Sequence, residues 1–370
     1  MKKIITLAAA AAVAGFAFAE GWSVGGYFRS GAEANTDAKD FETKTFKDGC
    51  PYGIYGNMNS RVRLNVNYTQ EDYGFKFRYQ CTGFGVNNNN SDADVWFDDG
   101  NLKYMYGYAK FLDGKIIGEA GKLSDSYTDG EGIQGFSAMD GYGLRALLVP
   151  VEGLYLSAAG TTYRAEKYKA TDKKVVVDKK AKEGDIKANE KLITLSAKYK
   201  NDAITVAGGY NFAGEAYGYF DLKTVPNLTF NVEVNYLDKD IADSKNDKGK
   251  DIANTTIWEQ VGYNFAETGI PLEAGIYCGQ IFVEDDNVFE FYPYMSYELN
   301  EFVTPQLEVG IIKYAEDEKH LDRDGDKQST TYSITPTLKL TPCEKTTVRV
   351  YYNYDKNDKH AVGTTLRVDF

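Results

Sequence analysis

The sequence predicts an all-β protein, a transmembrane antiparallel up-and-down β-barrel of 18 strands. Apolar and polar residues alternate almost everywhere after residue 21, which is typical of strands with one apolar and one polar face. Short turns alternate with mostly longer polar connections, as in a barrel that gathers its short turns at one rim. The alternating segments are about ten residues long, which suits a tilted strand that crosses a bilayer.

Residues 1–19 are expected to be a secretory signal peptide and not part of the fold. Lys2 and Lys3 give a positive start, an apolar run continues to Phe18, and small residues favour cleavage after Ala19. The apolar run is short for a membrane-spanning helix. Residues 20–370 are then predicted to form a single β-barrel domain.

The alternation is clear in residues 61–69, where Val62 and Leu64 share one side and Arg61 and Arg63 share the other. The predicted strands begin near residues 22, 58, 74, 100, 115, 141, 153, 191, 203, 216, 228, 254, 271, 288, 304, 329, 345 and 360. The hairpin around Gly214 is the least marked, and without it the number of strands is 16. Both numbers are even, as a single-chain bacterial barrel requires.

The connections divide into two sets, one for each rim. The predicted short turns are residues 70–73, 112–115, 150–153, 200–203, 224–227, 266–271, 300–304 and 341–345. The longer polar stretches are residues 31–57, 85–98, 124–140, 164–190, 239–253, 283–287, 315–328 and 355–360. The Lys-rich segment 164–191 is locally basic and is interpreted as a flexible surface loop.

The main alternative fold is a soluble β-sandwich, which also alternates but usually holds about 100 residues per domain. Here one pattern runs through the whole mature chain and ends on Phe370. In lipid every backbone polar group must be paired, and a closed barrel achieves this with strands. We therefore expect the last strand to pair with the first, near residues 22–30, and Phe370 to join an aromatic girdle rather than fray.

The composition narrows the class of partner. The chain carries a formal net charge of −12, so neither nucleic acid nor an anionic membrane surface is an expected partner. It holds 29 Tyr and 20 Phe, residues that suit pleated surfaces and membrane interfaces. No second apolar run long enough for a transmembrane helix follows the leader.

Residues 102–127, LKYMYGYAKFLDGKIIGEAGKLSDSY, resemble the strand–turn–strand that precedes the long third loop of Gram-negative general diffusion porins. The C-terminal alternation closing on Phe370 is similar to the assembly signal of the same family. Departures from that family are the possible 18 strands and the four Cys. The resemblance implies an outer-membrane homotrimer, surrounded by lipid, with a water-filled channel for passive diffusion of ions and small hydrophilic solutes. It also implies that loop 124–140 folds into the pore.

The candidate pore-lining residues carry opposite charges on two parts of the chain. The cations occupy the polar side of the first three strands and are Arg29, Arg61, Arg63, Lys76 and Arg78. The anions lie in loop 124–140 and include Asp125, Asp129 and Glu131. Facing each other across water, they would set a field that orients dipolar solutes, since patches of charge select ions in pores. The alternative is that they are ordinary solvated residues, and ion selectivity stays open.

The four Cys contain no CxxC pair. Cys50 and Cys81 fall near neighbouring loops, so either a disulfide in an oxidising compartment or two free thiols fits the sequence. Cys278 and Cys343 fall at different predicted heights and are not expected to pair.

The sequence contains few residues or motifs that would indicate an active site, a metal site or a bound cofactor. The only histidines are His320 and His360, and neither is accompanied by a nucleophile motif, so no enzyme is predicted. The Asp-rich segment 322–327 places Lys327 and Ser333 where a calcium-binding EF-hand needs Gly and Glu, so no metal site is predicted. No cofactor is expected. The remaining alternative is a surface adhesin or structural barrel whose loops plug the pore.

Overall fold

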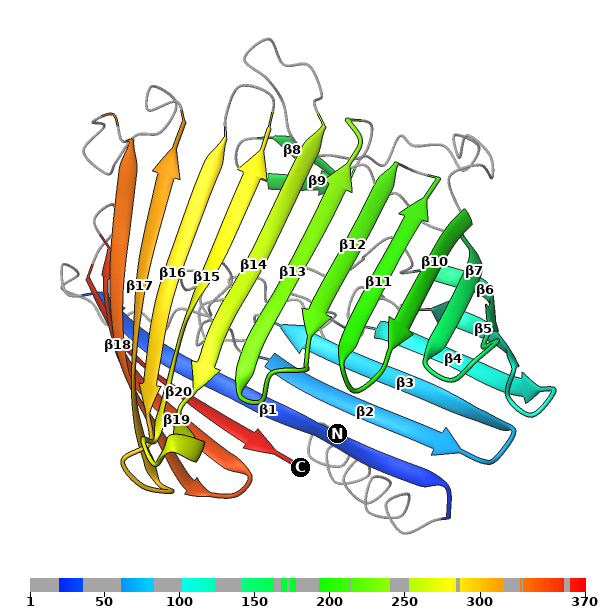
Figure 1. Ribbon diagram of the computed structural model, residues 1–370, viewed down its shortest axis with the longest axis horizontal. Coiled ribbons are helices and arrows are strands. Elements are labelled where there is room, and N and C mark those ends of the chain that lie inside the picture. Colours follow the sequence, from blue (N-terminus) through cyan, green and yellow to red (C-terminus); the bar gives the residue numbers. More distant parts are fainter. Residues whose placement is uncertain are drawn as a thin grey trace.

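A computed structural model describes residues 20–35, 61–82, 102–123, 141–162, 168–171, 174–177, 193–212, 214–239, 253–283, 287–315, 327, 329–355 and 360–370. Eighteen antiparallel strands form one sheet that closes on itself, and two further strands form a separate hairpin (Figure 1). No helix among the described residues is long and apolar enough to cross a membrane.

The strands follow the chain in order. The first half of the barrel comprises β1 (Trp22–Asn35), β2 (Arg61–Thr69), β3 (Tyr73–Thr82), β4 (Leu102–Phe111), β5 (Ile116–Leu123), β6 (Gly141–Leu148), β7 (Leu154–Thr162), β10 (Ile193–Lys200) and β11 (Ile204–Asn211). The second half comprises β12 (Glu215–Leu222), β13 (Leu228–Leu237), β14 (Asn254–Asn264), β15 (Leu272–Phe282), β16 (Val288–Tyr297), β17 (Val303–Tyr314), β18 (Thr330–Cys343), β19 (Thr346–Asp355) and β20 (Ala361–Asp369). A short 3-10 turn, η5 (Ala266–Thr268), lies between β14 and β15.

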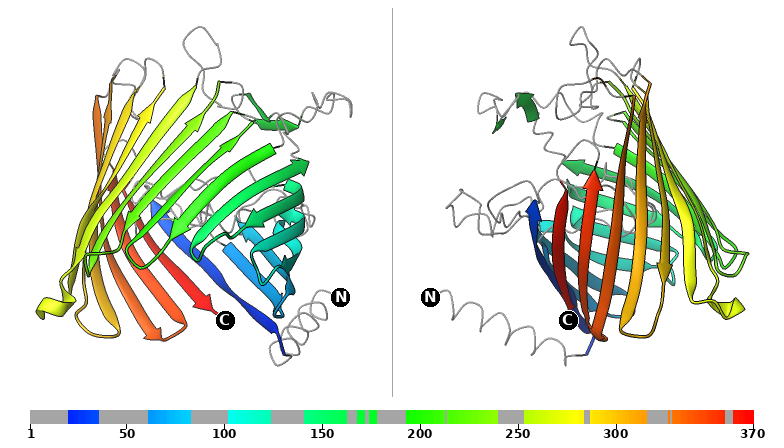
Figure 2. Two further views of the ribbon diagram at one scale, coloured as in Figure 1. Left: turned by 45° about the vertical axis from the view of Figure 1, so that its right-hand side comes forward. Right: turned by 90° about the vertical axis from the view of Figure 1, so that its left-hand side faces the viewer.

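The barrel closes where β20 pairs with β1. The register runs from Tyr27 opposite Asp369 to Asn35 opposite Ala361. Gly26 and Phe370 extend the ladder, because the backbone N–H of each donates to the carbonyl oxygen of the other at 3.0 Å. The expected pairing of the last strand with the first is therefore confirmed, and the two strands lie side by side in Figure 2.

The predicted strand count is also confirmed, including its least marked hairpin. β11 and β12 pair from Ile204 opposite Leu222 to Asn211 opposite Glu215, with a tight turn at Gly214 between them. Gly214 has φ +111°, and a Cβ there would lie 2.6 Å from Asp238 Cβ. Glycine suits this position because it tolerates positive φ and has no side chain to collide with Asp238. The 16-strand alternative is excluded by this pair.

Residues 164–191, interpreted from the sequence as a flexible surface loop, contain two short strands. Their described parts are β8 (Tyr168–Thr171) and β9 (Lys174–Val177), which pair antiparallel outside the barrel sheet. The valines of β9 favour an extended backbone. The many basic residues around them favour the interpretation as a surface loop instead.

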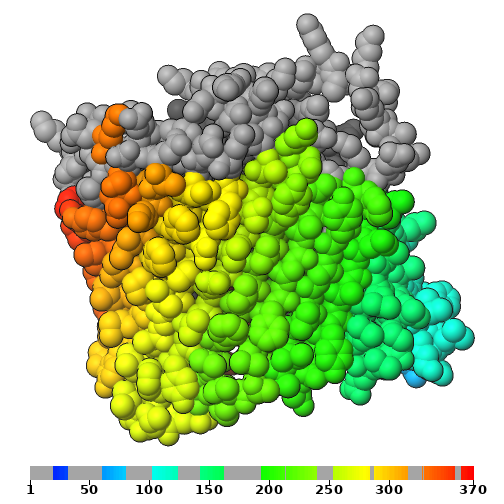
Figure 3. Space-filling model, turned by 45° about the horizontal axis from the view of Figure 1, so that its top comes forward, coloured from blue at the N-terminus to red at the C-terminus, as the bar shows by residue number. Residues whose placement is uncertain are grey.

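The two faces of the wall differ in polarity, as β10 illustrates. Thr194, Ser196 and Lys198 are buried, whereas the alternating residues Leu195 and Tyr199 are exposed. Strands such as β12, β18 and β20 alternate in a similar way, and large apolar side chains cover the outer face of the barrel. Figure 3 shows part of that outer wall, where the strands coloured green to orange form a continuous surface. The polar face is turned to the interior, here called the lumen.

Candidate functional site

The cations predicted from the first three strands all lie on the lumenal face. Arg29 is buried, with 9% of its surface exposed. Arg61 is its direct cross-strand partner and so shares its face, and Arg63, Lys76 and Arg78 continue that alternation on β2 and β3. These side chains are half-buried. The acidic residues predicted to oppose them, Asp125, Asp129 and Glu131, lie outside the described residues, as does the rest of loop 124–140.

Closure of the barrel adds lumenal cations that were not among the predicted site residues. Arg367 on β20 is the other cross-strand partner of Arg29, so Arg367, Arg29 and Arg61 form one lateral row across three strands. Arg349 on β19 pairs with Thr365 and shares this face with buried Tyr351. The alternation in residues 345–370 already indicates that Arg349 and Arg367 lie on the polar side of their strands. Their closeness to Arg29 depends on the pairing of β20 with β1.

Tyr27 is the centre of this basic group. The guanidinium carbons of Arg367, Arg63 and Arg29 lie 4.3, 5.2 and 6.0 Å from the centre of its ring. Arg61 Nη1 donates to Tyr27 Oη at 3.3 Å. Cations are attracted to the face of an aromatic ring, so one buried tyrosine from β1 holds arginines from β20, β1 and β2.

The neighbouring cations bond to neutral groups. Arg63 Nε and Nη2 donate to Gln80 Oε1 at 2.9 and 2.5 Å, and Arg78 Nε donates to Asn65 Oδ1 at 2.7 Å. Within the described part of the chain, the partners of Arg61, Arg63 and Arg78 are thus amides and phenols. Their positive charge is oriented by these contacts but is not neutralised by them.

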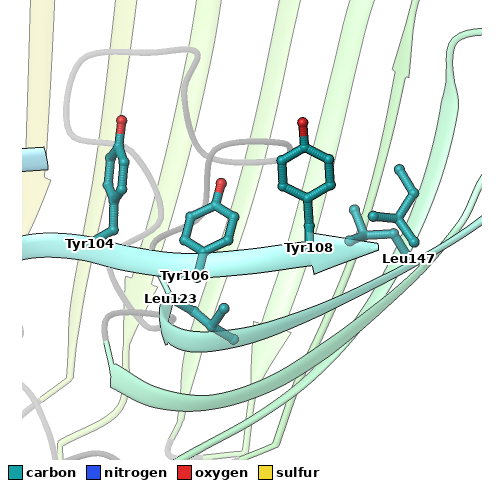
Figure 4. Close-up of a cluster of buried hydrophobic side chains, with 6 residues drawn as sticks. Tyr104, Tyr106, Tyr108, Leu123 and Leu147 are labelled. Atoms are coloured by element: carbon teal, nitrogen blue, oxygen red, sulfur yellow. The ribbon is translucent and has the colours of Figure 1, made fainter. Parts of the chain in front are cut away.

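A ladder of three tyrosines on β4 continues the site. The rings of Tyr104, Tyr106 and Tyr108 stand on the same side of the strand (Figure 4). All three are buried, together with Leu123 and Leu147. Arg78 lies over the Tyr104 ring at 4.9 Å and Lys76 over the Tyr108 ring at 5.9 Å. The ladder therefore extends the contact between cations and aromatic rings from Tyr27 to β4.

Glu119 on β5 and Arg145 on β6 form an ion pair with both side chains fully buried. The two residues are direct cross-strand partners. Arg145 Nε donates to Glu119 Oε2 at 2.6 Å, and Arg145 also lies 6.0 Å from the centre of the Tyr106 ring. This pair was not among the predicted site residues. The sequence does show an acidic and a basic residue in adjacent predicted strands, and this is the feature from which the pair could have been predicted.

The opposite part of the wall is acidic and aromatic. Glu233 on β13, Glu290 on β16 and Glu308 on β17 are buried on the lumenal face. Trp258 and Tyr277 stack with their ring centres 5.1 Å apart. In the described strands β12–β17, the lumenal positions carry no Lys or Arg. The lumen is therefore polarised, with cations on β19, β20 and β1–β3 and carboxylates on β13–β17.

The structure describes only some of the cysteines and histidines that the sequence analysis considered. Cys50 lies outside the described residues, and Cys81 is described only as a backbone partner of Val62 in β3, so their disulfide stays a prediction. Cys278 and Cys343 are free thiols. His360 contacts the Tyr352 hydroxyl, while His320 lies outside the described residues.

No protein-family model matches the sequence, and no curated protein matches it. Solved outer-membrane porins and channels have a similar architecture. OmpT of Vibrio cholerae, in a trimer form, is 11% identical, with 94% of this chain and 99% of that chain covered and a TM-score of 0.48. The outer membrane channel DcaP of Acinetobacter baumannii is 11% identical, with coverages of 94% and 97% and a TM-score of 0.46. A mutant of the Rh. blastica porin is 13% identical, with coverages of 94% and 100% and a TM-score of 0.44.

Proposed function

We propose that this protein is an outer-membrane porin, a water-filled channel for passive diffusion of ions and small hydrophilic solutes. One observation carries the proposal: a closed barrel of eighteen strands has an apolar outer face and a charged, polar inner face. Barrels with about 16 to 18 strands are wide enough to leave an aqueous channel. A sheet can lie in lipid only when it is closed, because every backbone polar group is then paired.

The aromatic residues at one rim support the membrane location. The short-turn ends of the strands carry exposed aromatic side chains, which are Tyr73, Phe111, Phe302 and Phe370. Aromatic girdles mark the interfaces of bacterial barrels, so these residues would lie at the boundary between lipid and periplasmic water. A signal peptide in residues 1–19 would direct the chain to the periplasm.

The polarised lumen suggests how the channel would act on solutes. Cations on β1–β3 and carboxylates on β13–β17 face a common space, and opposite charges across a narrow aqueous gap produce a transverse field. Ions and dipolar solutes would align with the field. Apolar solutes would have to displace the water that the field orders. Arg29, Arg61, Arg63, Lys76 and Arg78 would form one side of this field, and Asp125, Asp129 and Glu131 would add negative charge if loop 124–140 folds inward.

Single-channel recording from the purified mature chain in a planar bilayer tests the proposal. Stepwise currents of uniform size are expected. A barrel with native strand content and heat-modifiable gel mobility that gives no current would contradict the channel and would favour a plugged adhesin or structural barrel.

We also propose that the barrel assembles as a homotrimer. The outer wall over β4–β7 is hollowed where small residues gather, namely Gly107, Ala109, Gly118, Ala120, Ala146 and Ala158. Small side chains let a second wall approach closely. Unboiled gel mobility reports the assembly, and Ala158→Trp, which fills this hollow, is expected to shift the trimer to monomer while the barrel remains folded.

A further inference from the structure

We propose that the lateral row of Arg367, Arg29 and Arg61, supported by Arg63, is a binding site for small solutes that carry two or more oxyanion groups. The inference rests on the proposed channel, because solutes would reach the row through the lumen. It names a solute class that a charged lumen alone does not specify.

The spacing of the row defines the ligand. Arg29 lies directly opposite Arg61 on one side and Arg367 on the other. Neighbouring strands are about 4.8 Å apart, so the three Cα positions span about 10 Å. A solute with carboxylate or phosphate groups separated by a few bonds can bridge neighbouring members of such a row. A solute with a single charge can engage only one or two of them.

The row places like charges directly opposite each other on three neighbouring strands. Like charges placed directly opposite each other destabilise a sheet. Arg367 forms an ion pair with Asp369, with Nη2 and Oδ1 2.6 Å apart, but the described partners of Arg61 and Arg63 are neutral. A bound polyanion would offset the repulsion that remains.

The guanidinium groups have donors available. A guanidinium carries five N–H donors in a planar fork that matches the oxygens of carboxylate and phosphate. Among the described residues, Arg61 gives one hydrogen bond, to Tyr27 Oη, and Arg63 gives two, both to Gln80 Oε1. Arg61 Nε is buried, so the remaining Nη donors of Arg61 and Arg63 are the ones that could form the charge-assisted bonds on which anion recognition depends.

Tyr27 holds the row in place before a solute arrives. Its ring lies within 6.0 Å of three guanidinium carbons, so the long side chains are already ordered and lose less entropy on binding. The row can also be reached, because Arg61 and Arg63 are half-buried and the Arg367 side chain is 39% exposed.

The experiment measures block of potassium chloride current by citrate and by acetate at equal ionic strength. Citrate, with three carboxylates, is expected to block at far lower concentration than acetate. The double variant Arg61→Gln with Arg63→Gln is expected to need about tenfold more citrate, because charge-assisted hydrogen bonds are lost. Lys198→Gln is the matched control, since Lys198 is a buried lumenal cation on β10, away from the row.

The outcomes separate this proposal from the channel itself. Currents that citrate and acetate affect equally, or an equal loss of block in Lys198→Gln, would overturn the anion site while leaving the channel in place. A folded but silent barrel would instead overturn the channel. In that case calorimetric titration of the detergent-solubilised mature chain with citrate decides the site, since an Arg61- and Arg63-dependent heat supports it and no heat refutes it.

Discussion

The indole ring of Trp258 lies against Gly279, its direct cross-strand partner on the lumenal face. A Cβ on Gly279 would collide with ring atoms of Trp258. The same arrangement recurs for three other pairs, Tyr351 with Gly363, Tyr294 with Gly275, and Tyr108 with Gly74. A flat ring thus covers the backbone where the facing residue has no side chain, an arrangement known to support glycines in sheets.

Gly279→Ala is expected to lower the free energy of unfolding by about 1–3 kcal/mol, because the added methyl group displaces the ring from a packed position. Urea titration followed by tryptophan fluorescence measures the change. Gly160→Ala is the control, since a Cβ at Gly160 meets no atom within 4 Å. Equal stability of both variants would show that the ring adjusts without cost.

Glu119→Gln should cost about 3–5 kcal/mol of unfolding free energy, because it leaves the buried charge of Arg145 without its carboxylate. The same urea titration provides the value. Replacing both residues, as Glu119→Gln with Arg145→Met, should recover much of the loss, since no lone charge is then buried. A double variant as unstable as the single one would mean that packing, not charge, determines the cost.

Removing the acidic wall should reduce cation preference. Glu233→Gln, Glu290→Gln and Glu308→Gln together delete three buried lumenal carboxylates, so the ratio of cation to anion permeability is expected to fall at least about twofold. Reversal potential in a salt gradient reports this ratio. Glu259→Gln is the control, because Glu259 follows lumenal Trp258 in β14 and so lies on the outer face. An unchanged reversal potential in the triple variant would place the selective charges elsewhere.

Deleting residues 361–370 should abolish the folded barrel, because β1 and β19 would each lose a strand partner. Heat-modifiable gel mobility is the readout, and the truncated chain is expected to migrate at one position whether boiled or not. A truncated chain that still shifts would indicate that β1 and β19 pair directly in a narrower barrel.

Much of the fold could be predicted from alternation alone. A strand with one lipid-facing and one water-facing side repeats every two residues, so boundaries such as those of β13 and β14 follow directly from the residues. The hairpin at Gly214 was harder to recognise because its connection is tight and lies at the rim where most connections are long. The β8–β9 hairpin lies outside the barrel and has no alternating lipid face to reveal it.

The candidate site was predictable only within single strands. The lumenal faces of Arg29, Arg61 and Arg63 followed from local alternation. Their neighbours Arg367 and Arg349 are more than 280 positions away in the sequence, and only closure of the sheet brings them together. The stacking around Tyr27 depends on side-chain geometry that no periodic pattern contains.

The pairing of β1 with β20 also sets an order for biogenesis. β1 leaves the ribosome before the other barrel strands, whereas its partner β20 is made last. Until β20 is made, one edge of β1 therefore has backbone donors and acceptors without a strand partner, and such edges readily recruit other chains. That edge of β1 must therefore be shielded until β20 pairs with it.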